Sequence, residues 1–365
     1  MARAKLKGMR LLSAAALVAA ATACALAGCT TASREATKAL EVKVVVVTMF
    51  EIGADTGDTA GEFQLWHERQ KLDTRLPFAH HHDLYYNAST GVLGMVTGMG
   101  TANSASATME LGMDPRFDLS HAYWLVAGIA GVDPADASIG SAAWAEYLVD
   151  GDLAHEIDPR EMPADWPTGY FARGTHRPYD PKKPTPDGEV FHLNASLTSW
   201  AFNLTRDVKL DDSPELKKER DAFTGFPNAQ RPPFVLKGDN LAAMTFWHGT
   251  VLNEWAEKWV SYWTDGKGNF VTSAMEDTGT FQSLTYLHPT GKVNKDRVMV
   301  LRTASNFTMQ PPGGMTAAEH LLRENEGYAG LTASVEAAYR VGSVVVNEIV
   351  THWERYRDRT PPYDK

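Results

Sequence analysis

A methionine followed directly by a glutamate, Met275-Glu276, is the pair in this sequence whose chemistry is easiest to interpret. The pair lies within Val271 to Thr280, a pattern typical of a strand that ends and leads into a helix. A carboxylate fixed there can accept hydrogen bonds from two neighbouring hydroxyl groups, such as those of a ribose, while the thioether packs against the sugar. An acidic residue at a helix start is also stabilised by the helix dipole alone. The pair by itself leaves both interpretations open.

Two glycine-rich segments, each after an apolar run, offer backbone groups to a ligand. Gly98 and Gly100 follow the run at 91–97 and precede small residues typical of a helix start. The segment Gly128-Ile129-Ala130-Gly131 follows the run at 121–127, and we interpret it as a turn at a strand end. Backbone N–H groups at such turns can meet an anion or the polar edge of a ligand. The first segment is not a dinucleotide fingerprint, because the third glycine and an acidic ribose partner are missing.

Asn306 and the pair Phe246-Trp247 are residue types that can recognise a planar base. The Asn306 side chain carries a donor and an acceptor, so it can pair with the N7 edge of a purine. Phe246 and Trp247 either stack on a base or pack in the core, and the sequence leaves both open. His80 and His82 have the spacing of two metal ligands on a strand, but no partner motif accompanies them. We predict no metal site and no cofactor.

Strand-like and helix-like patterns surround these residues. The run at 42–50 is apolar and β-branched, typical of a strand buried on both faces of a parallel or mixed sheet. Residues 158–190 are rich in proline and charge, and we expect a surface excursion there. We predict an α/β fold in a single domain over residues 41–358. Further strands are expected at 91–97, 121–127, 142–149, 232–239 and 296–302, and helices at 62–69, 191–206, 213–223, 252–262 and 335–353.

Charge and the N-terminus limit the class of protein. The 365-residue chain has a formal net charge of −10, which argues against nucleic acid as a partner. Basic residues precede the apolar stretch Leu11 to Leu26, which is too short for a membrane span. The stretch leads to Ala27-Gly28-Cys29, and this junction resembles a bacterial lipobox. We predict a lipoprotein signal peptide over residues 1–29, lipidation at Cys29 and a flexible tether over residues 30–40. We expect membrane contact only through this lipid anchor, because no later stretch has the length and apolarity of a span.

Four blocks together resemble the nucleoside phosphorylase/nucleosidase superfamily. Each lies near a predicted strand end, and they occur in the same order as in that superfamily: Thr97 to Asn103, Ala127 to Pro134, Ser273 to Glu276, and Arg302 to Asn306. Within the superfamily the chain most resembles the purine nucleoside permease family, over nearly all of residues 40–358. The resemblance implies a three-layer fold with a central mixed, curved β-sheet flanked by helices, and a purine nucleoside as the ligand.

The resemblance also implies roles for individual residues. Met275 and Glu276 would hold the ribose. It places Asn306 near N7 of the base and makes Phe246 and Trp247 a stacking surface. Backbone atoms of Ile129, Ala130 and Gly131 would also approach the base. Gly98 and Gly100 would lie in an adjoining loop.

The chain departs from the phosphorylases of this superfamily where they hold phosphate. Their Arg and Ser are matched here by Val126 and Ile129, and the loop after the first strand is acidic where they carry an Arg. A phosphate dianion would be repelled there, so phosphorolysis is disfavoured. Nucleosidases of the superfamily use a carboxylate from this loop region to activate water, and Glu51 or Glu62 could fill that role. The sequence does not decide between them.

Two functions of different classes follow, and a third possibility is a structural protein that kept the fold and lost the pocket. The first is a bacterial envelope lipoprotein, exposed to the periplasm or the outside, that binds purine nucleosides and serves their uptake, either as a receptor or with a separate membrane transporter. The second is a nucleosidase that hydrolyses the N-ribosidic bond. Members of the superfamily usually assemble, so we also expect a homo-oligomer, a dimer or larger. Sedimentation of only monomer at high concentration would contradict that expectation.

Overall fold

The computed structural model describes residues 38–361, and a compact unit begins at Ala39. The predicted signal peptide, Cys29 and all but the last residues of the predicted tether lie outside the described residues. Regular elements run from the short strand β1 (Leu40–Glu41) to the short helix α10 (Trp353–Tyr356).

A large mixed sheet forms the middle layer. Its central strand is β7 (Tyr123–Val132), with β2 (Val44–Thr48) parallel to it on one edge and β16 (Val298–Phe307) parallel to it on the other. The main path through the sheet is β12-β9-β14-β15-β7-β2-β5-β4-β3, and β16 continues through β8 to β13. The remaining strands are β3 (Thr74–Leu76), β4 (Leu84–Asn87), β5 (Val92–Val96), β8 (Ala142–Ala145), β9 (Tyr147–Asp150), β12 (Val190–His192), β13 (Val235–Lys237), β14 (Asp239–Ala242) and β15 (Phe270–Ala274).

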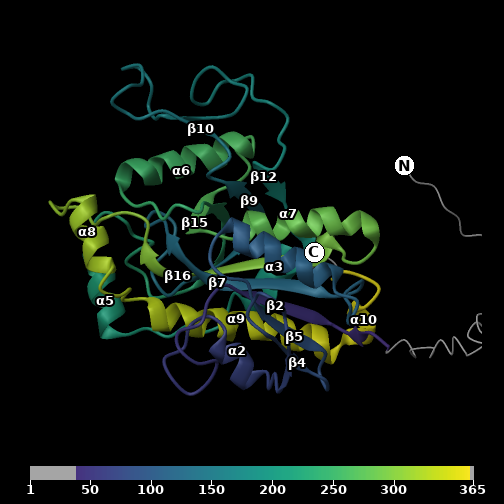
Figure 1. Ribbon diagram of the computed structural model, residues 1–365. Helices are drawn as coiled ribbons and strands as arrows, with labels where there is room; N and C mark the ends of the chain where they lie inside the picture. The colour runs from purple at the N-terminus through teal and green to yellow at the C-terminus, as the bar shows by residue number, and fades with distance from the viewer. Residues whose placement is uncertain (1–37, 362–365) are drawn as a thin grey trace, which may run out of the picture. The chain divides into compact units, whose positions relative to one another are not determined.

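Alternate residues of the central strands pack into two different cores. On β2, Val45 and Val47 face a core shared with helices α3 (Thr101–Met113) and α7 (Asp277–Leu287). Val44 and Val46 face the opposite core, which is shared with helices α2 (Gln64–Arg69), α4 (Ala195–Thr205) and α9 (Leu331–Thr351). Figure 1 shows α3 and α7 on one side of the sheet and α2 and α9 on the other. Side chains alternate across a strand, so a strand covered on both faces needs a continuous apolar run. The predicted three-layer α/β fold is confirmed.

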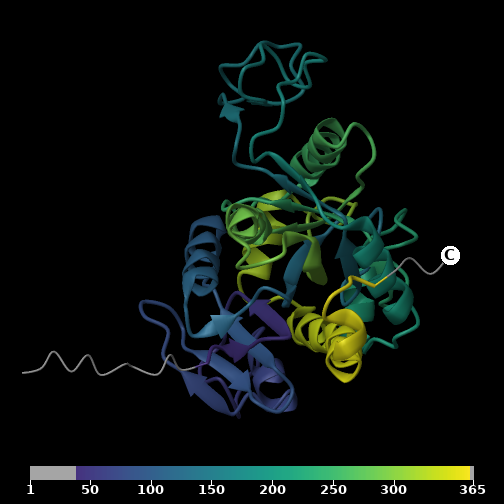
Figure 2. The ribbon, with the colours of Figure 1, turned by 90° about the vertical axis from the view of Figure 1, so that its right-hand side faces the viewer.

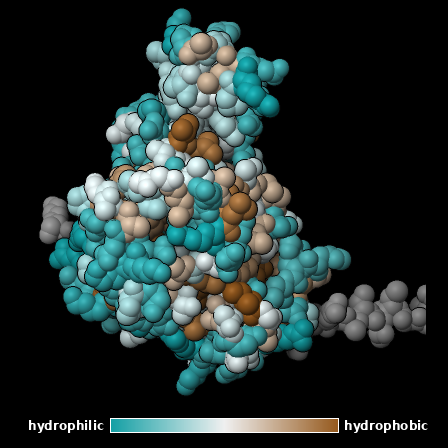
Figure 3. Space-filling model, turned by 90° about the vertical axis from the view of Figure 1, so that its left-hand side faces the viewer, coloured by the Kyte–Doolittle hydropathy of each residue, from teal (hydrophilic) through white to brown (hydrophobic). Residues whose placement is uncertain are grey.

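Further helices cover the ends of the sheet. Helix α6 (Thr250–Trp263) packs its tryptophans against β9, β14 and β15. Beyond it, residues 151–189 form a long excursion with the short pair β10 (His155–Glu156) and β11 (Tyr170–Phe171), seen at the top of Figures 1 and 2. Helices α5 (Pro214–Asp221) and α8 (Ala317–Glu324) lie on a mostly hydrophilic face with separate apolar areas (Figure 3). The short elements are β6 (Phe117–Asp118), η1 (His288–Thr290) and η2 (Lys295–Arg297).

None of the helices within residues 38–361 combines the length and the apolar character that crossing a membrane requires.

The predicted turn at Gly128–Gly131 is wrong, because these residues belong to β7. The strand continues to Val132, since β16 pairs with it from Trp124 to Val132 and supplies hydrogen-bond partners along this length. The predicted strand at 142–149 is two strands, β8 and β9, with different neighbours. The helix predicted from residue 191 begins at Ala195, because Val190–His192 pair with β9 as strand β12.

Candidate functional site

The site is organised around a gap beside the central strand. On one edge of β7, β2 pairs with residues 123–126 and β15 pairs with residues 131–132. Because β2 runs parallel to β7 and β15 runs antiparallel, both strands direct their carboxyl ends towards the stretch between them. This places Met49, which follows β2, and Met275-Glu276, which follow β15, at one site. The predicted junction of a strand leading into a helix is confirmed, since α7 begins at Asp277.

A cavity of about 450 Å³ lies at this gap, and we call it the main cavity. Its volume is within the range of small-molecule sites, roughly 300–1,000 Å³. The predicted site residues that line it are Glu62, Ile129, Ala130, Gly131, Phe246, Met275, Glu276 and Asn306. Segments from across the chain therefore converge on one cavity.

Glu276 is held from three sides at the wall of the main cavity. Its Oε1 accepts a hydrogen bond from the N–H of Gly100 at 3.0 Å, and its Oε2 accepts one from the N–H of Met275 at 3.3 Å. Arg302 Nη2 lies 2.9 Å from the same Oε2. Gly100 has a φ of 90°, a conformation that favours glycine. Gly100 therefore positions Glu276 from the adjoining loop, and neither Gly98 nor Gly100 lines the cavity itself.

Arg302 is buried under the cavity with its charge fully paired. The side chain is 1% exposed, and its guanidinium contacts Asp277 at 2.9 Å in addition to Glu276. Its Nη1 also donates to the carbonyl of Ile129 at 3.1 Å. Burial acts to lower the pKa of Arg302, but Asp277, Glu276 and Glu62 outweigh burial and raise the pKa above its ordinary value. No other basic side chain lines the main cavity in the described part of the chain, so no free cation there awaits a phosphate.

Glu62 also lines the main cavity. Its two oxygens accept hydrogen bonds from the N–H groups of Ile129 and Met49, each at 2.7 Å. Burial raises the pKa of Glu62 to about 8, with Glu276 adding to the effect and Arg302 opposing it. A carboxyl group with this pKa is a stronger base than an ordinary glutamate once it has lost its proton.

Gly128 allows this close assembly of side chains. A Cβ atom at this position would overlap Met49 Cε and lie 2.6 Å from Arg302 Nη1 and 2.7 Å from Glu62 Oε1. The close approach of these side chains explains the glycine, and no turn is needed to account for it.

Glu51 has a different position from Glu62. It accepts hydrogen bonds from the N–H groups of Ile52 at 2.9 Å, Phe63 at 2.8 Å and Gln64 at 2.5 Å, and also from that of Gly61. These contacts close the acidic loop onto the start of α2, and Glu51 does not line the main cavity. Of the two acidic residues that the sequence left open, Glu62 is the one that faces the cavity.

Asn306 reaches the main cavity because β16 contains a bulge. The pairing with β7 shifts between Ala304 and Asn306, so Ser305 is the extra residue and Asn306 lies opposite Gly131. Both Ser305 and Asn306 therefore line the cavity, which a regular strand would not allow. Ser305 Oγ donates to Asn306 Oδ1 at 2.9 Å and helps to fix the amide.

Phe246 and Trp247 point to different surroundings. Phe246 lines the main cavity, is 44% exposed, and lies nearly parallel to Tyr328, with ring centroids 6.3 Å apart. Trp247 packs against Trp255 and Phe270 in the core and borders only a small hollow of about 20 Å³ beside the main cavity. Tyr328 and Phe50, which the sequence analysis did not single out, are further aromatic residues that line the cavity.

Glu324, His248 and His320 form a group that the sequence analysis missed, with both histidines buried and Glu324 partly buried. Their ligand atoms lie within 4.8 Å of one another, so a metal ion is one occupant to consider. However, His320 Nδ1 and His248 Nε2 are 3.0 Å apart, with ring centroids at 5.0 Å and an interplanar angle of 13°. This is hydrogen-bond distance, so one ring can donate to the other, and it is shorter than the roughly 3.3 Å between two nitrogens bound at about 2.0–2.1 Å to one tetrahedral ion. The histidines are 72 residues apart in sequence, so no spacing motif marks them.

Of the histidines singled out in the sequence, His82 binds Asp55 through Nε2 at 2.7 Å and His80 is exposed in a turn.

Residues 41–361 match the family described as purine nucleoside permease (NUP). A purine nucleoside permease of Candida albicans (strain SC5314) is 31% identical over 288 residues, which cover 77% of this chain and 69% of that protein. A probable purine nucleoside permease of Schizosaccharomyces pombe is 29% identical over 279 residues, covering 74% of this chain and 79% of that protein.

Solved nucleosidase structures share the fold. A putative 5′-methylthioadenosine/S-adenosylhomocysteine nucleosidase of Francisella philomiragia has a TM-score of 0.51 at 14% identity, covering 83% of this chain and 98% of that one. The corresponding nucleosidase of Helicobacter pylori also has a TM-score of 0.51 at 14% identity, covering 84% and 99%. The chain belongs to the purine nucleoside permease family, and it has the fold of the nucleoside phosphorylase/nucleosidase superfamily.

Proposed function

We propose that this chain binds a purine nucleoside in the main cavity and that this binding serves nucleoside uptake. The observation that carries the proposal is Glu276, a buried carboxylate with both oxygens anchored and its side chain at the cavity wall. Oε2 already accepts from Met275 and Arg302, but Oε1 has a further lone pair, so Glu276 can also accept a hydrogen bond from a ribose hydroxyl. The family name supports uptake as the process that the binding serves.

The rest of the cavity fits the base of the same ligand. With the ribose at Met275 and Glu276, the base extends towards Asn306, whose amide offers a donor and an acceptor. Phe246 and Tyr328 supply flat apolar surfaces on which a purine can stack. Backbone atoms of Ala130 and Gly131 line the same end of the cavity.

Glu276→Gln is expected to weaken adenosine binding by roughly tenfold to a hundredfold, because hydrogen bonds to a carboxylate are stronger than those to an amide. Isothermal titration calorimetry measures the change. As a ligand control, 2′,3′-dideoxyadenosine should bind the wild type weakly and be almost insensitive to the substitution. As a matched protein control, Asp277→Asn removes another carboxylate partner of Arg302 that does not line the cavity. Its effect on affinity should be smaller.

Unchanged adenosine affinity in a folded Glu276→Gln variant would end the ribose assignment. Failure of the wild type to bind any purine nucleoside would end the proposed function itself.

Hydrolysis of the N-ribosidic bond is the second candidate function, and Glu62 is the observation that favours it. Its carboxyl group faces the main cavity and holds a raised pKa, as a base that activates water requires. Incubation with adenosine or inosine, with and without phosphate, separates the candidates. Free base in both samples supports hydrolysis, base only with phosphate supports phosphorolysis, and intact bound nucleoside supports a receptor.

The lipid anchor and the envelope location rest on the N-terminal sequence, and the fungal relatives give them no support. We propose lipidation at Cys29 as a separate, testable feature of the chain. In a bacterial host, the full chain should incorporate labelled palmitate and sediment with membranes, and Cys29→Ser should abolish both. Equal labelling of the two chains would contradict the anchor.

A further inference from the structure

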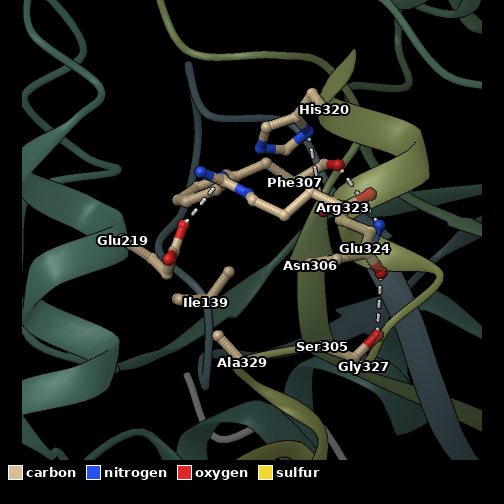
Figure 4. A pocket seen from close by; sticks show the side chains of 10 residues that line it. All are labelled: Ile139, Glu219, Ser305, Asn306, Phe307, His320, Arg323, Glu324, Gly327 and Ala329. Carbon is tan, nitrogen blue, oxygen red and sulfur yellow. Dashed lines mark hydrogen bonds and ion pairs between the residues drawn. The ribbon is translucent and has the colours of Figure 1, made fainter. Parts of the chain in front are cut away.

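His248, His320 and Glu324 bring together two imidazoles and one carboxylate, and the proposed function uses none of them. His320 and Glu324 are four residues apart on α8, so their side chains lie on the same face of this helix. His248 precedes α6, and the next residue, Gly249, donates its N–H to the carbonyl of Thr308 at 3.0 Å. Figure 4 shows His320 and Glu324 beside a second cavity of about 110 Å³, which both residues line.

The distances within this group fit an ion with neighbouring ligands at right angles. The candidate ligand atoms all lie within 4.8 Å of one another. The 3.0 Å between His248 Nε2 and His320 Nδ1 is too short for a tetrahedral ion. At right angles, however, two bonds of about 2.0–2.1 Å place their nitrogens roughly 2.9 Å apart, as in an octahedral ion.

Only the carboxylate has to move closer to complete such a site. Glu324 Oε1 lies 3.8 Å from His320 Nδ1, so binding requires it to approach by roughly 0.5–0.9 Å. The other oxygen, Oε2, is buried and has no hydrogen-bond partner within the described residues, so no such bond holds it against this movement.

The charges around the group also favour a bound cation. Burial lowers the pKa values of His248 and His320 to about 4, so both imidazoles are neutral near pH 7 and each can offer a lone pair. Burial raises the pKa of Glu324 to about 8, and Arg323 opposes this only in part. Arg323 itself extends to Glu219, at 3.2 Å (Figure 4). A divalent ion would supply the missing positive charge and displace the proton of the carboxyl group.

We propose that His248, His320 and Glu324 bind a divalent transition-metal ion, at a site that the sequence did not predict. Two imidazoles and one carboxylate are a ligand set for ions such as Zn²⁺ and Fe²⁺, and they leave further positions for water. The second cavity has room for these waters. The amide of Asn306 donates to Glu324, as an outer-shell group that orients a metal ligand does. The ion links α8 to the segment before α6, and the site requires no nucleoside.

Isothermal titration calorimetry of the metal-free full chain with Zn²⁺ tests the proposal. We expect a single site per chain with a micromolar or lower Kd, and no binding of Mg²⁺, because Mg²⁺ prefers oxygen ligands. Glu324→Gln, which keeps the size of the side chain, and His320→Asn should each raise the Kd by about a hundredfold or more. This exceeds the roughly 10–100-fold that is usual for loss of an outer-shell partner.

The run His80 to His82 is another place where imidazoles could hold an ion, so His82→Gln is the matched control. His82 also contacts a carboxylate, that of Asp55 at 2.7 Å, but it does not belong to the proposed site. His82→Gln should bind Zn²⁺ as the wild type does.

The Tm of the unsubstituted chain provides a readout that no variant can disturb. An ion that binds only the folded state stabilises it, so Zn²⁺ should raise the Tm and Mg²⁺ should not. The increase should be absent in Glu324→Gln.

The proposal is overturned if the wild type binds no Zn²⁺, if Glu324→Gln and His320→Asn bind it as tightly as the wild type, or if His82→Gln alone abolishes binding. None of these outcomes involves adenosine, so failure of the metal site leaves the proposed function standing.

Discussion

If the chain hydrolyses the N-ribosidic bond, Glu62→Gln is expected to lower the rate of base release from adenosine by about 10²–10⁴-fold, the usual contribution of a positioned general base. Glutamine keeps the size of the side chain but cannot take a proton from water. The expected result is a large fall in kcat with a small change in adenosine affinity, because Glu276 and Asn306 still hold the ligand. Single-turnover measurements of free adenine on the full chain check it.

The pH dependence of the wild type provides a second readout. Glu62 works as a base only after losing its proton, so the rate should rise with pH and level off above about 8, the pKa to which burial raises this group. Glu62→Gln should lose this rise. A rate that falls as the pH passes from 6 towards 8 would contradict the role of Glu62 as a base.

Glu51→Gln is the matched control for Glu62, since both are glutamates at the ends of one acidic loop that accept backbone hydrogen bonds. Glu51 holds the loop and the start of α2 and does not line the main cavity. Its substitution should lower stability more than rate. If Glu51→Gln abolished base release and Glu62→Gln did not, the assignment would be reversed. Base release that requires phosphate would exclude hydrolysis.

The layers of the fold were predictable because burial leaves a regular trace in the sequence. The run at 42–50 contains β2, which is buried on both faces, and the apolar positions of 335–353 mark α9, which packs on one face of the sheet. The error at Gly128–Gly131 has a physical cause. Glycine marks either a turn or a place where other atoms come close, and composition cannot separate the two. At Gly128 the reason is the close approach of Met49, Arg302 and Glu62.

The site was predictable where a residue directly follows a strand and not where distant segments meet. Met275 and Glu276 could be placed because a strand, a carboxylate and a helix start are consecutive. Glu324 is the last residue of α8, and it lines the cavity together with residues that follow it in the chain before α9. No strand or motif next to Glu324 in the sequence marks it as a cavity residue. To choose between Glu51 and Glu62, one must know which of the two side chains faces the main cavity. That depends on which backbone N–H groups donate hydrogen bonds to each carboxylate, and a sequence does not show this.

Arg302→Met is expected to lower the free energy of unfolding by about 3–5 kcal/mol, the usual cost of removing one partner from a buried ion pair. Methionine fills a similar volume without charge, so the loss should come from the two carboxylates, Glu276 and Asp277, that are left buried without a cation. Urea denaturation of the chain measures the change. Arg297→Met is a matched control, because this buried arginine donates to the backbone carbonyls of His121 and Tyr356 and leaves no carboxylate behind. Its loss should be smaller.

The same cause predicts how stability is recovered. If uncompensated charge is responsible, adding Glu276→Gln and Asp277→Asn to Arg302→Met should restore a large part of the lost free energy, because the three residues form one network and their effects are not additive. The triple variant should nevertheless bind adenosine poorly, since the ribose carboxylate is gone. This network has two roles. Arg302 on β16 holds the residues that follow β2 and β15, and the network presents Glu276 to the ligand. Recovery of stability without recovery of binding would separate these two roles. If the triple variant were as unstable as Arg302→Met, the loss would instead come from the packing and hydrogen bonds of the guanidinium, and the charge argument would be wrong.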